Sequence, residues 1–388
     1  MIHLGVFFGS NTVEHEISVI TAIQAIEHLK KLPNYKIVPV YVSKSGDTYT
    51  GDALFDMDNF KNLEKLKTQL TPITLVKGNQ VVQLLEIPFK ALKNPVIDEI
   101  HVAFPIFHGS FGEDGTFQGL FELLDIPYVG CDVLSAATTM DKIASKLIMK
   151  ECGIPVVDYY WLNANEWIED PMQHMLAIEK QFTYPVIVKP ANTGSSIGVS
   201  VAHNRDELES AINLVRKFSN RILIEYMVQN IMEVNISVLG DSEHAEVSLI
   251  ERPITAAEFL TFKDKYESNS KTEGMSSAKR EIPAILPDGM KESIEAIALK
   301  AFKVLDCSGV SRLDFIIDQS TGTVYLNELN TIPGSLSFYL WEPTGIPYPE
   351  LLERLIGLAH SKHRRKKRLI FSNNTNILSG VDLKGIKK

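Results

Sequence analysis

The sequence predicts a protein of mixed α/β and α+β class that is built from two or three packed units. The chain has 388 residues, more than one hydrophobic core usually organises. Residues 4–42 follow a strand, helix, strand pattern, and this order produces a parallel sheet through a right-handed crossover. From Pro185 onward the pattern changes to short apolar runs, which are typical of further strands.

The first unit is expected to be a parallel α/β sheet. Residues 4–8 form a short apolar run that indicates a buried strand, and residues 36–42 predict the next strand. Between them, apolar residues recur at helical spacing over residues 19–26. A later strand is predicted over residues 102–107 and ends at His108. The loop after it therefore lies at the carboxyl end of a strand, where open α/β sheets bind ligands.

Beyond a boundary near residue 130, the sequence predicts helices first and short strands later. Residues 261–281 are polar and lack periodicity, which is typical of an active-site lid or a disordered insert. A helix is expected over residues 290–305, and a last helix over residues 349–360. The strands of this part are expected at residues 186–188, 197–201, 222–224 and 234–239, and around Leu313 and Leu326.

Composition excludes several functional classes. The net charge of −9 argues against a general nucleic-acid binder. The first residues lack the basic and apolar pattern of a signal peptide, and no uninterrupted apolar run reaches the roughly 18 residues of a membrane span. We therefore expect a cytoplasmic protein that binds neither nucleic acid nor membrane.

The cysteines and a basic run near the end are assigned structural or neutral roles. Cys131, Cys152 and Cys307 are far apart and lack zinc-site spacing, so they are interpreted as buried small hydrophobes in a reducing compartment. Residues 362–368 are densely basic and fit contact with nucleic acid or anionic lipid, but a solvated tail is the favoured interpretation. Residues 369–388 are polar and continue this tail.

A glycine- and serine-rich loop after a predicted strand is a candidate phosphate site. Residues 186–199 read VIVKPANTGSSIGV, so a buried strand delivers Lys189 directly before the loop. A lysine ammonium suits phosphate oxygens, and glycines allow backbone N–H groups to approach an anion. A plain glycine-rich hairpin is the alternative, although it requires neither the lysine nor the paired serines.

Two predicted strands near the end of the folded region carry a candidate metal site. Side chains alternate along a strand, so Arg312 shares one face with Asp314, and Glu328 shares one face with Asn330. Carboxylate and amide oxygens, together with phosphate oxygens, are ligands that suit Mg²⁺. The alternative is a solvated sheet face with a surface salt bridge.

Two further polar loops are ambiguous on their own. In residues 108–115, the acids near a predicted helix start are explained by the helix dipole, and His108 suits either a core position or a functional one. Glu14 follows the first strand, where its carboxylate fits a substrate ammonium. A first-turn helix charge explains Glu14 equally well.

Taken together and in this order, these segments resemble the D-alanine–D-alanine ligase family of the ATP-grasp superfamily. The resemblance runs from about residue 3 to residue 360. The matching segments are GSNTVEHEIS, HGSFGEDGTFQG, MDK at residues 140–142, KPANTGSSIGVS, DKY at residues 264–266, SRLDF and LNELNTIPG. Each segment is weak alone, and the seven in register are specific.

The resemblance implies a fold and a reaction. It implies an N-terminal Rossmann-like (pre-ATP-grasp) domain over residues 1–130, followed by a two-part ATP-grasp fold over residues 131–230 and 231–362. The second part contains the lid at residues 261–281, and residues 363–388 form the tail. The implied reaction joins two D-alanines through an acyl phosphate for peptidoglycan synthesis and releases ADP and phosphate. The implied cofactors are ATP and two Mg²⁺ ions, with Mn²⁺ as a substitute, and a homodimer is usual for the family.

The resemblance also implies residue roles. Glu14 binds the ammonium of the first D-alanine, Ser195 and Tyr266 complete its hydrogen-bonded set, and Arg312 stabilises the oxyanion. His108 and the backbone of Gly334 face the second substrate. The implied metal ligands are Asp314, Glu328 and Asn330. The implied ATP-binding residues are Lys142, Lys189, Ser196, Glu225, Val228, Glu233 and Lys265, with residues 225–228 as the adenine-binding connector.

One segment departs from the family pattern. After Gly334 the family usually carries a threonine and then a serine, which line the pocket for the second substrate's carboxylate. Leu336 and Tyr339 replace them here. Either Ser337 or the Tyr339 hydroxyl fits as a substitute donor, or the pocket accepts a different amino acid or hydroxy acid. A non-catalytic nucleotide-binding protein is a further alternative, which the intact metal and arginine motifs disfavour.

Overall fold

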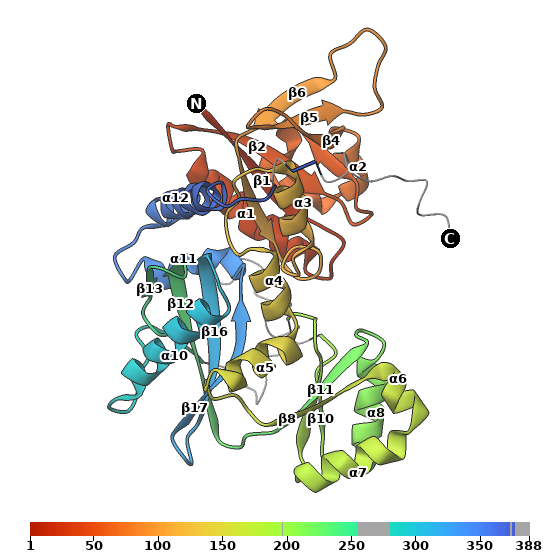
Figure 1. Cartoon of the computed structure of the whole chain (residues 1–388), viewed down its shortest axis with the longest axis vertical. Coiled ribbons are helices and arrows are strands. Elements are labelled where there is room, and N and C mark those ends of the chain that lie inside the picture. Colours follow the sequence, from red (N-terminus) through yellow and green to blue (C-terminus); the bar gives the residue numbers. More distant parts are fainter. Residues whose placement is uncertain (196, 255–279, 373–374, 377–388) are drawn as a thin grey trace.

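The structure is a computed structural model in which residues 1–195, 197–254, 280–372 and 375–376 are described. Three sheets form three lobes (Figure 1). Ser196, Lys265, Tyr266 and most of the expected lid at residues 261–281 lie outside the described residues.

The N-terminal lobe contains a seven-stranded sheet in the order β6-β5-β4-β3-β2-β1-β7. Its parallel core consists of β1 (Ile2–Gly9), β2 (Tyr35–Val42) and β7 (Val102–Phe107), and α1 (His15–Leu29) connects β1 to β2. The expected strand, helix, strand unit is therefore confirmed. The antiparallel extension and its short helices are β3 (Thr48–Thr50), η1 (Asp52–Phe55), η2 (Met57–Lys61), α2 (Leu63–Lys67), β4 (Thr71–Lys77), β5 (Val82–Glu86) and β6 (Val96–Ile100).

The central lobe is a four-stranded antiparallel sheet with helices on one face. Val186 and Val188 of β9 pack into the core beneath the helices, whereas Ile187 and Lys189 point the other way and line a cavity. The strands are β8 (Tyr159–Asn163), β9 (Val186–Pro190), β10 (Ser200–Ala202) and β11 (Arg221–Tyr226). The covering helices are α6 (Ala164–Glu169), α7 (Pro171–Gln181) and α8 (Arg205–Val215). The helices α3 (Thr116–Leu124), α4 (Val133–Met140) and α5 (Lys142–Glu151) precede this lobe.

The third lobe is a second four-stranded antiparallel sheet, in the order β13-β12-β16-β17. Leu313, Phe315 and Ile317 alternate into its core, so Arg312 and Asp314 occupy the opposite face, as predicted. The strands are β12 (Ile231–Gly240), β13 (Ala245–Val247), β16 (Gly309–Asp318) and β17 (Thr323–Asn330), and α10 (Met290–Val304) covers the core. A two-stranded ribbon, β14 (Arg252–Pro253) with β15 (Arg280–Glu281), lies beside β12.

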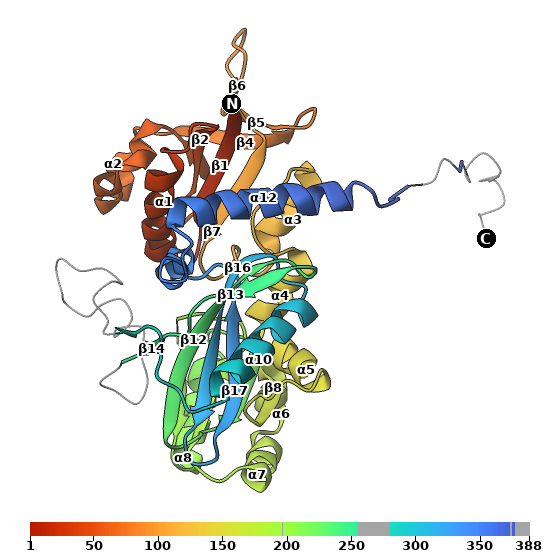
Figure 2. The same cartoon turned by 90° about the vertical axis from the view of Figure 1, so that its left-hand side faces the viewer.

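After β17 the chain returns to the N-terminal lobe. It passes through η3 (Gly334–Ser337) and α11 (Phe338–Trp341) into α12 (Tyr348–Lys366), which crosses the N-terminal lobe in Figure 2. Buried α12 residues such as Leu352 and Leu355 belong to the same core as β1 and α1. The last helix thus stabilises the first domain, although it lies more than 200 residues beyond that domain's expected boundary near residue 130.

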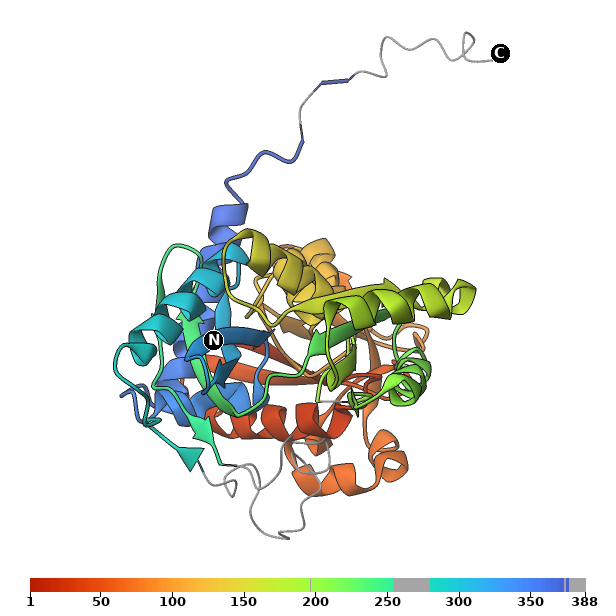
Figure 3. The same ribbon diagram turned by 90° about the horizontal axis from the view of Figure 1, so that it is seen from below.

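The basic run differs from its expected form as a solvated tail. Helix α12 continues to Lys366 rather than ending near His360, and it takes in most of the run. Lys362 lies 2.5 Å from Asp132, and Arg365 lies 2.8 Å from Asp241. These carboxylates neutralise side chains that would otherwise repel one another along the helix. The described chain leaves the body of the molecule only after α12 (Figure 3).

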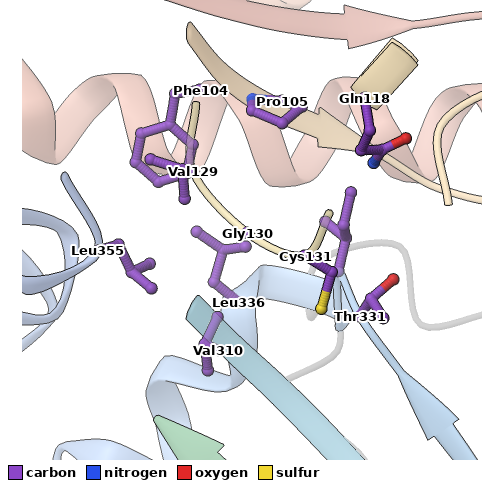
Figure 4. A pocket seen from close by; sticks show the side chains of 11 residues that line it. Phe104, Pro105, Gln118, Val129, Gly130, Cys131, Val310, Thr331, Leu336 and Leu355 are labelled. Atoms are coloured by element: carbon purple, nitrogen blue, oxygen red, sulfur yellow. The ribbon is translucent and has the colours of Figure 1, made fainter. Parts of the chain in front are cut away.

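The N-terminal lobe and the third lobe meet at an apolar junction, shown in Figure 4. Gly309 has φ +87°, and an added Cβ there would lie 2.9 Å from the Cα of Gly130, so the two backbones pass very close to each other. Leu336 and Cys131 also lie at this junction. Cys131 and Cys307 are buried as expected, while Cys152 is half-buried. No helix among the described residues is long and apolar enough to cross a bilayer.

Replacing a buried leucine of α12 by alanine is expected to destabilise the protein. Leu355 is fully buried, so Leu355→Ala should lower the free energy of unfolding by about 2–5 kcal/mol through lost burial and a residual cavity. Leu123→Ala is the control, because Leu123 is a helical leucine that is 81% exposed, and its change should stay within about 0.5 kcal/mol. Urea unfolding of both variants tests this, and equal midpoints would contradict the packing role of α12.

Candidate active site

A cavity of about 300 Å³ is lined by residues from all three lobes. It brings together side chains whose positions range from residue 14 to residue 339, including both predicted polar loops of the N-terminal lobe. Ser337 does not line it. The predicted residues that line the cavity are Glu14, His108, Lys142, Lys189, Ser195, Glu225, Val228, Glu233, Arg312, Asp314, Glu328, Asn330, Gly334 and Tyr339.

Glu14 is enclosed by two glycine-containing loops. Its carboxylate accepts a hydrogen bond from the Ser195 hydroxyl, across 181 residues of sequence. A Cβ added at Gly109 or at Gly194 would lie 2.6 Å from Glu14 Oε2, so both loops approach as closely as only glycine permits. Glu14 stands at the N-cap of α1 but makes no side-chain capping hydrogen bond. Its carboxylate therefore serves the cavity rather than the helix.

Glu113, which the sequence analysis explained by the helix dipole, lines the cavity. Its two carboxylate oxygens accept hydrogen bonds from the Gly109 N–H at 2.9 Å and the Ile332 N–H at 3.1 Å. It thereby connects the loop after β7 to the loop after β17. Burial, reinforced by the negative charge of Glu14, raises the pKa of Glu113 to about 8.

His108 is a buried, neutral histidine at the end of β7. Its Nε2 lies 3.1 Å from the hydroxyl oxygen of Thr21 on α1. Burial, together with the positive charge of Arg312, lowers the pKa of His108 to about 4. The imidazole therefore carries no charge at neutral pH, and it can hydrogen-bond a substrate without attracting an anion.

The lysines form two groups. Lys142, at the start of α5, donates to the Thr193 carbonyl at 2.7 Å and lies 3.8 Å from Glu328. Lys189 pairs with Glu225, whose other oxygen lies 2.6 Å from Lys146. Burial alone would raise the pKa of Glu225, but the two lysines outweigh it and lower that pKa to about 2.

Lys146 was not singled out from the sequence. It is 1% exposed and lies one helical turn after Lys142 on α5, which is the signal that could have identified it. Burial lowers its pKa, although Glu225 opposes this effect. Lys146 and Lys189 therefore share the Glu225 carboxylate, which would otherwise pair with Lys189 only.

The carboxylate and amide trio meets on neighbouring strands. Asp314 and Glu328 are cross-strand partners, and the amide of Asn330 donates to Asp314 at 3.2 Å. Arg312 forms a two-pronged ion pair with Asp314 at 2.7 and 2.8 Å. Three oxygen-bearing side chains on one wall suit a hard cation, provided that Asn330 turns its amide oxygen inward. This trio contains only two carboxylates, and among the described residues no group of three or more His, Cys, Asp or Glu side chains is arranged to hold a metal ion.

The acceptor segment after Gly334 is unusual in its backbone. Ser335, Leu336 and Ser337 are three consecutive residues with φ near +51°, a conformation that L-residues rarely adopt. Leu336 points into the apolar junction rather than into the cavity. Ser337 is fully buried, and its hydroxyl has no hydrogen-bond partner in the described part of the chain. Of the two substitute donors considered, Tyr339 is the one that lines the cavity.

Two family profiles match the chain. The profile described as D-ala D-ala ligase N-terminus matches residues 3–131, and that described as D-ala D-ala ligase C-terminus matches residues 148–357. The chain belongs to the D-alanine–D-alanine ligase family. The family resemblance stated from the motifs is therefore confirmed.

Relatives and solved structures agree with this assignment. D-alanine–D-alanine ligase from Thermosipho melanesiensis is 40% identical over 381 residues, which are 97% of this chain and 98% of the relative. The ligase of the same name from Acetivibrio thermocellus is also 40% identical, over 92% of this chain and 96% of the relative. The structure of the D-alanine–D-alanine ligase from Coxiella burnetii has a TM-score of 0.78 and 28% identity, covering 94% of this chain and 96% of that one. The expected ATP-grasp fold and the class of ATP-dependent ligase are confirmed.

Removing Lys146 is expected to destabilise the buried charge cluster. Lys146→Met should lower the free energy of unfolding by about 3 kcal/mol, because the buried Glu225 loses one of its two cations. Lys150→Met, on the exposed side of the same helix, is the matched control and should change it by less than about 0.5 kcal/mol. Urea denaturation of the two variants decides the matter. Identical stabilities would mean that Lys189 alone neutralises Glu225.

Proposed function

We propose that the chain joins two D-alanines to D-alanyl-D-alanine for peptidoglycan synthesis, through an acyl phosphate and with release of ADP and phosphate. The observation that carries this proposal is that one cavity contains the Glu14–Ser195 pair, the lysines and the Asp314–Glu328–Asn330 wall. The relatives that match nearly the whole chain are named D-alanine–D-alanine ligases, which favours D-alanine as the acceptor.

The first half of the reaction is phosphoryl transfer. A carboxylate resists attack by an amine because oxide is a poor leaving group, and phosphorylation supplies a good one. Lys142 and Lys189 hold the ATP phosphates, and Glu14 holds the ammonium of the first D-alanine so that its carboxylate faces the γ-phosphate. Val228, in the β11–β12 connection, and Glu233, in β12, line the part of the cavity that we assign to the adenosine. Asp314, Glu328 and Asn330 would hold the two expected Mg²⁺ ions, which would supply positive charge to neutralise the phosphates.

The second half is attack by the amine of the second D-alanine. The tetrahedral intermediate places negative charge on one oxygen, and Arg312 with nearby backbone N–H groups stabilises it. The neutral His108 and the backbone of Gly334 position the acceptor. In this proposal Ser196, Lys265 and Tyr266, which lie outside the described residues, complete the contacts with ATP and the first substrate.

The remaining expectations belong to this proposal as well. The domains are assigned to residues 1–130, 131–230 and 231–362, with helix α12 of the third range packed into the core of the first. In this proposal the enzyme is cytoplasmic and forms a homodimer. An acceptor other than D-alanine is also tested, because Tyr339 stands where the family usually carries a serine. A structural neighbour with a TM-score of 0.76 and 29% identity, covering 92% of this chain and 99% of that one, is the VanG D-Ala:D-Ser ligase from Enterococcus faecalis.

Phosphate release identifies the acceptor. With ATP, Mg²⁺ and D-alanine alone, the protein should release phosphate and form D-alanyl-D-alanine. Adding D-serine or D-lactate to the same mixture should add little mixed product. If phosphate is released only when D-alanine is combined with D-serine or D-lactate, the acceptor is not D-alanine. If the protein binds ATP but releases no phosphate with any pair, it is non-catalytic.

Neutralising Glu328 should abolish turnover. Glu328→Gln removes a carboxylate from the predicted metal wall, so we expect kcat to fall by at least about 100-fold, since transition-state charge on the phosphates loses its counter-ions. The exposed Glu292→Gln is the control and should retain normal activity. A Glu328→Gln enzyme with normal turnover would show that the metal site lies elsewhere.

A further inference from the structure

A cluster of four polar side chains lines the same cavity as Gly334. The Tyr339 hydroxyl donates to Glu251 Oε1 at 3.0 Å, and the Asn235 amide donates to the same oxygen at 3.0 Å. Arg280 lies over the Tyr339 ring at 4.0 Å, and its Nη1 is 3.6 Å from Glu251 Oε2. All four residues line the cavity. Arg280 belongs to β15 and Glu251 directly precedes β14, so the ribbon carries half of the cluster.

The Tyr339 hydroxyl is poorly suited to bind a carboxylate. A phenol has one proton, and in Tyr339 that proton is donated to Glu251. Burial raises the pKa of Tyr339 to about 12, so the hydroxyl remains protonated and keeps this bond at neutral pH. A substrate carboxylate accepts hydrogen bonds and offers none. A tyrosine at the position of the family's serine therefore does not simply replace the serine as a donor.

The carboxylate of the acceptor nevertheless needs a counter-charge. A carboxylate that is removed from water without a partner is strongly disfavoured. Ser337 is buried and does not line the cavity, and the side chain of Leu336 has no polar group, while its backbone N–H donates to the Pro333 carbonyl. Arg312 is held by Asp314 through two hydrogen bonds, which directs it to the metal wall. Of the cavity's cationic side chains, Arg280 is the one that packs on Tyr339.

We propose that Arg280 binds the carboxylate of the second amino acid and that the Tyr339 ring holds its guanidinium in place. This inference rests on the proposed ligase function and identifies a specificity determinant within it. A guanidinium has N–H donors along more than one edge, so it can face Glu251 and still bind a second carboxylate in a two-pronged manner. The guanidinium carbon lies 4.0 Å from the centre of the Tyr339 ring, and this contact holds the donors in place. Glu251 is enclosed by Tyr339, Asn235 and Arg280, which limits its repulsion of the substrate.

A competition between two acceptors tests this assignment. D-alaninamide lacks the carboxylate that is phosphorylated, so it can enter the reaction only as the acceptor. The enzyme is given ATP, Mg²⁺ and equal concentrations of D-alanine and D-alaninamide, and the ratio of D-alanyl-D-alanine to D-alanyl-D-alaninamide is measured by mass spectrometry. The wild-type chain should favour D-alanine strongly. Arg280→Gln should reduce this ratio by about 10- to 100-fold while the KM for ATP stays within about 3-fold.

The matched variants separate the side chains. Tyr339→Phe keeps the ring and loses the hydroxyl, so its product ratio should stay within about 3-fold of wild type, whereas Tyr339→Ala should approach Arg280→Gln. Arg252→Gln, on the paired strand β14 and outside the cavity, should leave the ratio unchanged. If Arg280→Gln does not fold, Arg280→Lys decides, and its ratio should fall by at least about 3-fold because the planar fork is lost.

The outcomes distinguish the inference from the function beneath it. If the wild-type chain forms no dipeptide of either kind, the proposed ligase activity fails. If it forms both and the folded Arg280 variant keeps the wild-type ratio, the assignment of Arg280 is overturned although the ligase activity stands. A fall in the ratio for Tyr339→Phe as large as that for Arg280→Gln would identify the tyrosine hydroxyl as the donor and would also overturn the inference.

Discussion

The hydrogen bond from Ser195 to Glu14 is the contact on which the site depends, because it joins the first domain to the glycine loop of the central lobe. It exists because glycines on both sides leave room for the carboxylate. Gly109 belongs to a loop at the end of β7 and Gly194 to the loop after β9. The loops of two domains therefore both approach the Glu14 carboxylate closely. The Glu14 carboxylate is thereby held against the glycine loop that follows β9.

The same cavity requires its buried charges to compensate one another. Glu225 is neutralised by two lysines, and Asp314 by Arg312. In a region of low dielectric constant, unpaired charges of this kind would be strongly destabilising. This pairing places cations and carboxylates side by side in the cavity.

Much of this arrangement was predictable because it is local in sequence. Alternation along a strand placed Arg312 with Asp314 and Glu328 with Asn330, and the strand before Lys189 placed that lysine at the entrance of the glycine loop. Local patterns were less reliable at the C-terminus. The basic run was expected to be a tail because its neutralising partners, such as Asp241, are distant in sequence.

The sequence by itself determined the family, the strand, helix, strand unit at its start, and the chemical types gathered in the site, since each depends on spacing over a few residues. Tertiary structure decided which distant groups meet. Glu251 and Arg280 are separated by 28 intervening residues and carry no joint signal, yet the β14–β15 ribbon brings them to Tyr339. Leu336 and Ser337 likewise turned away from the cavity because three left-handed residues redirect the backbone. Such outcomes depend on packing between lobes, which no short segment encodes.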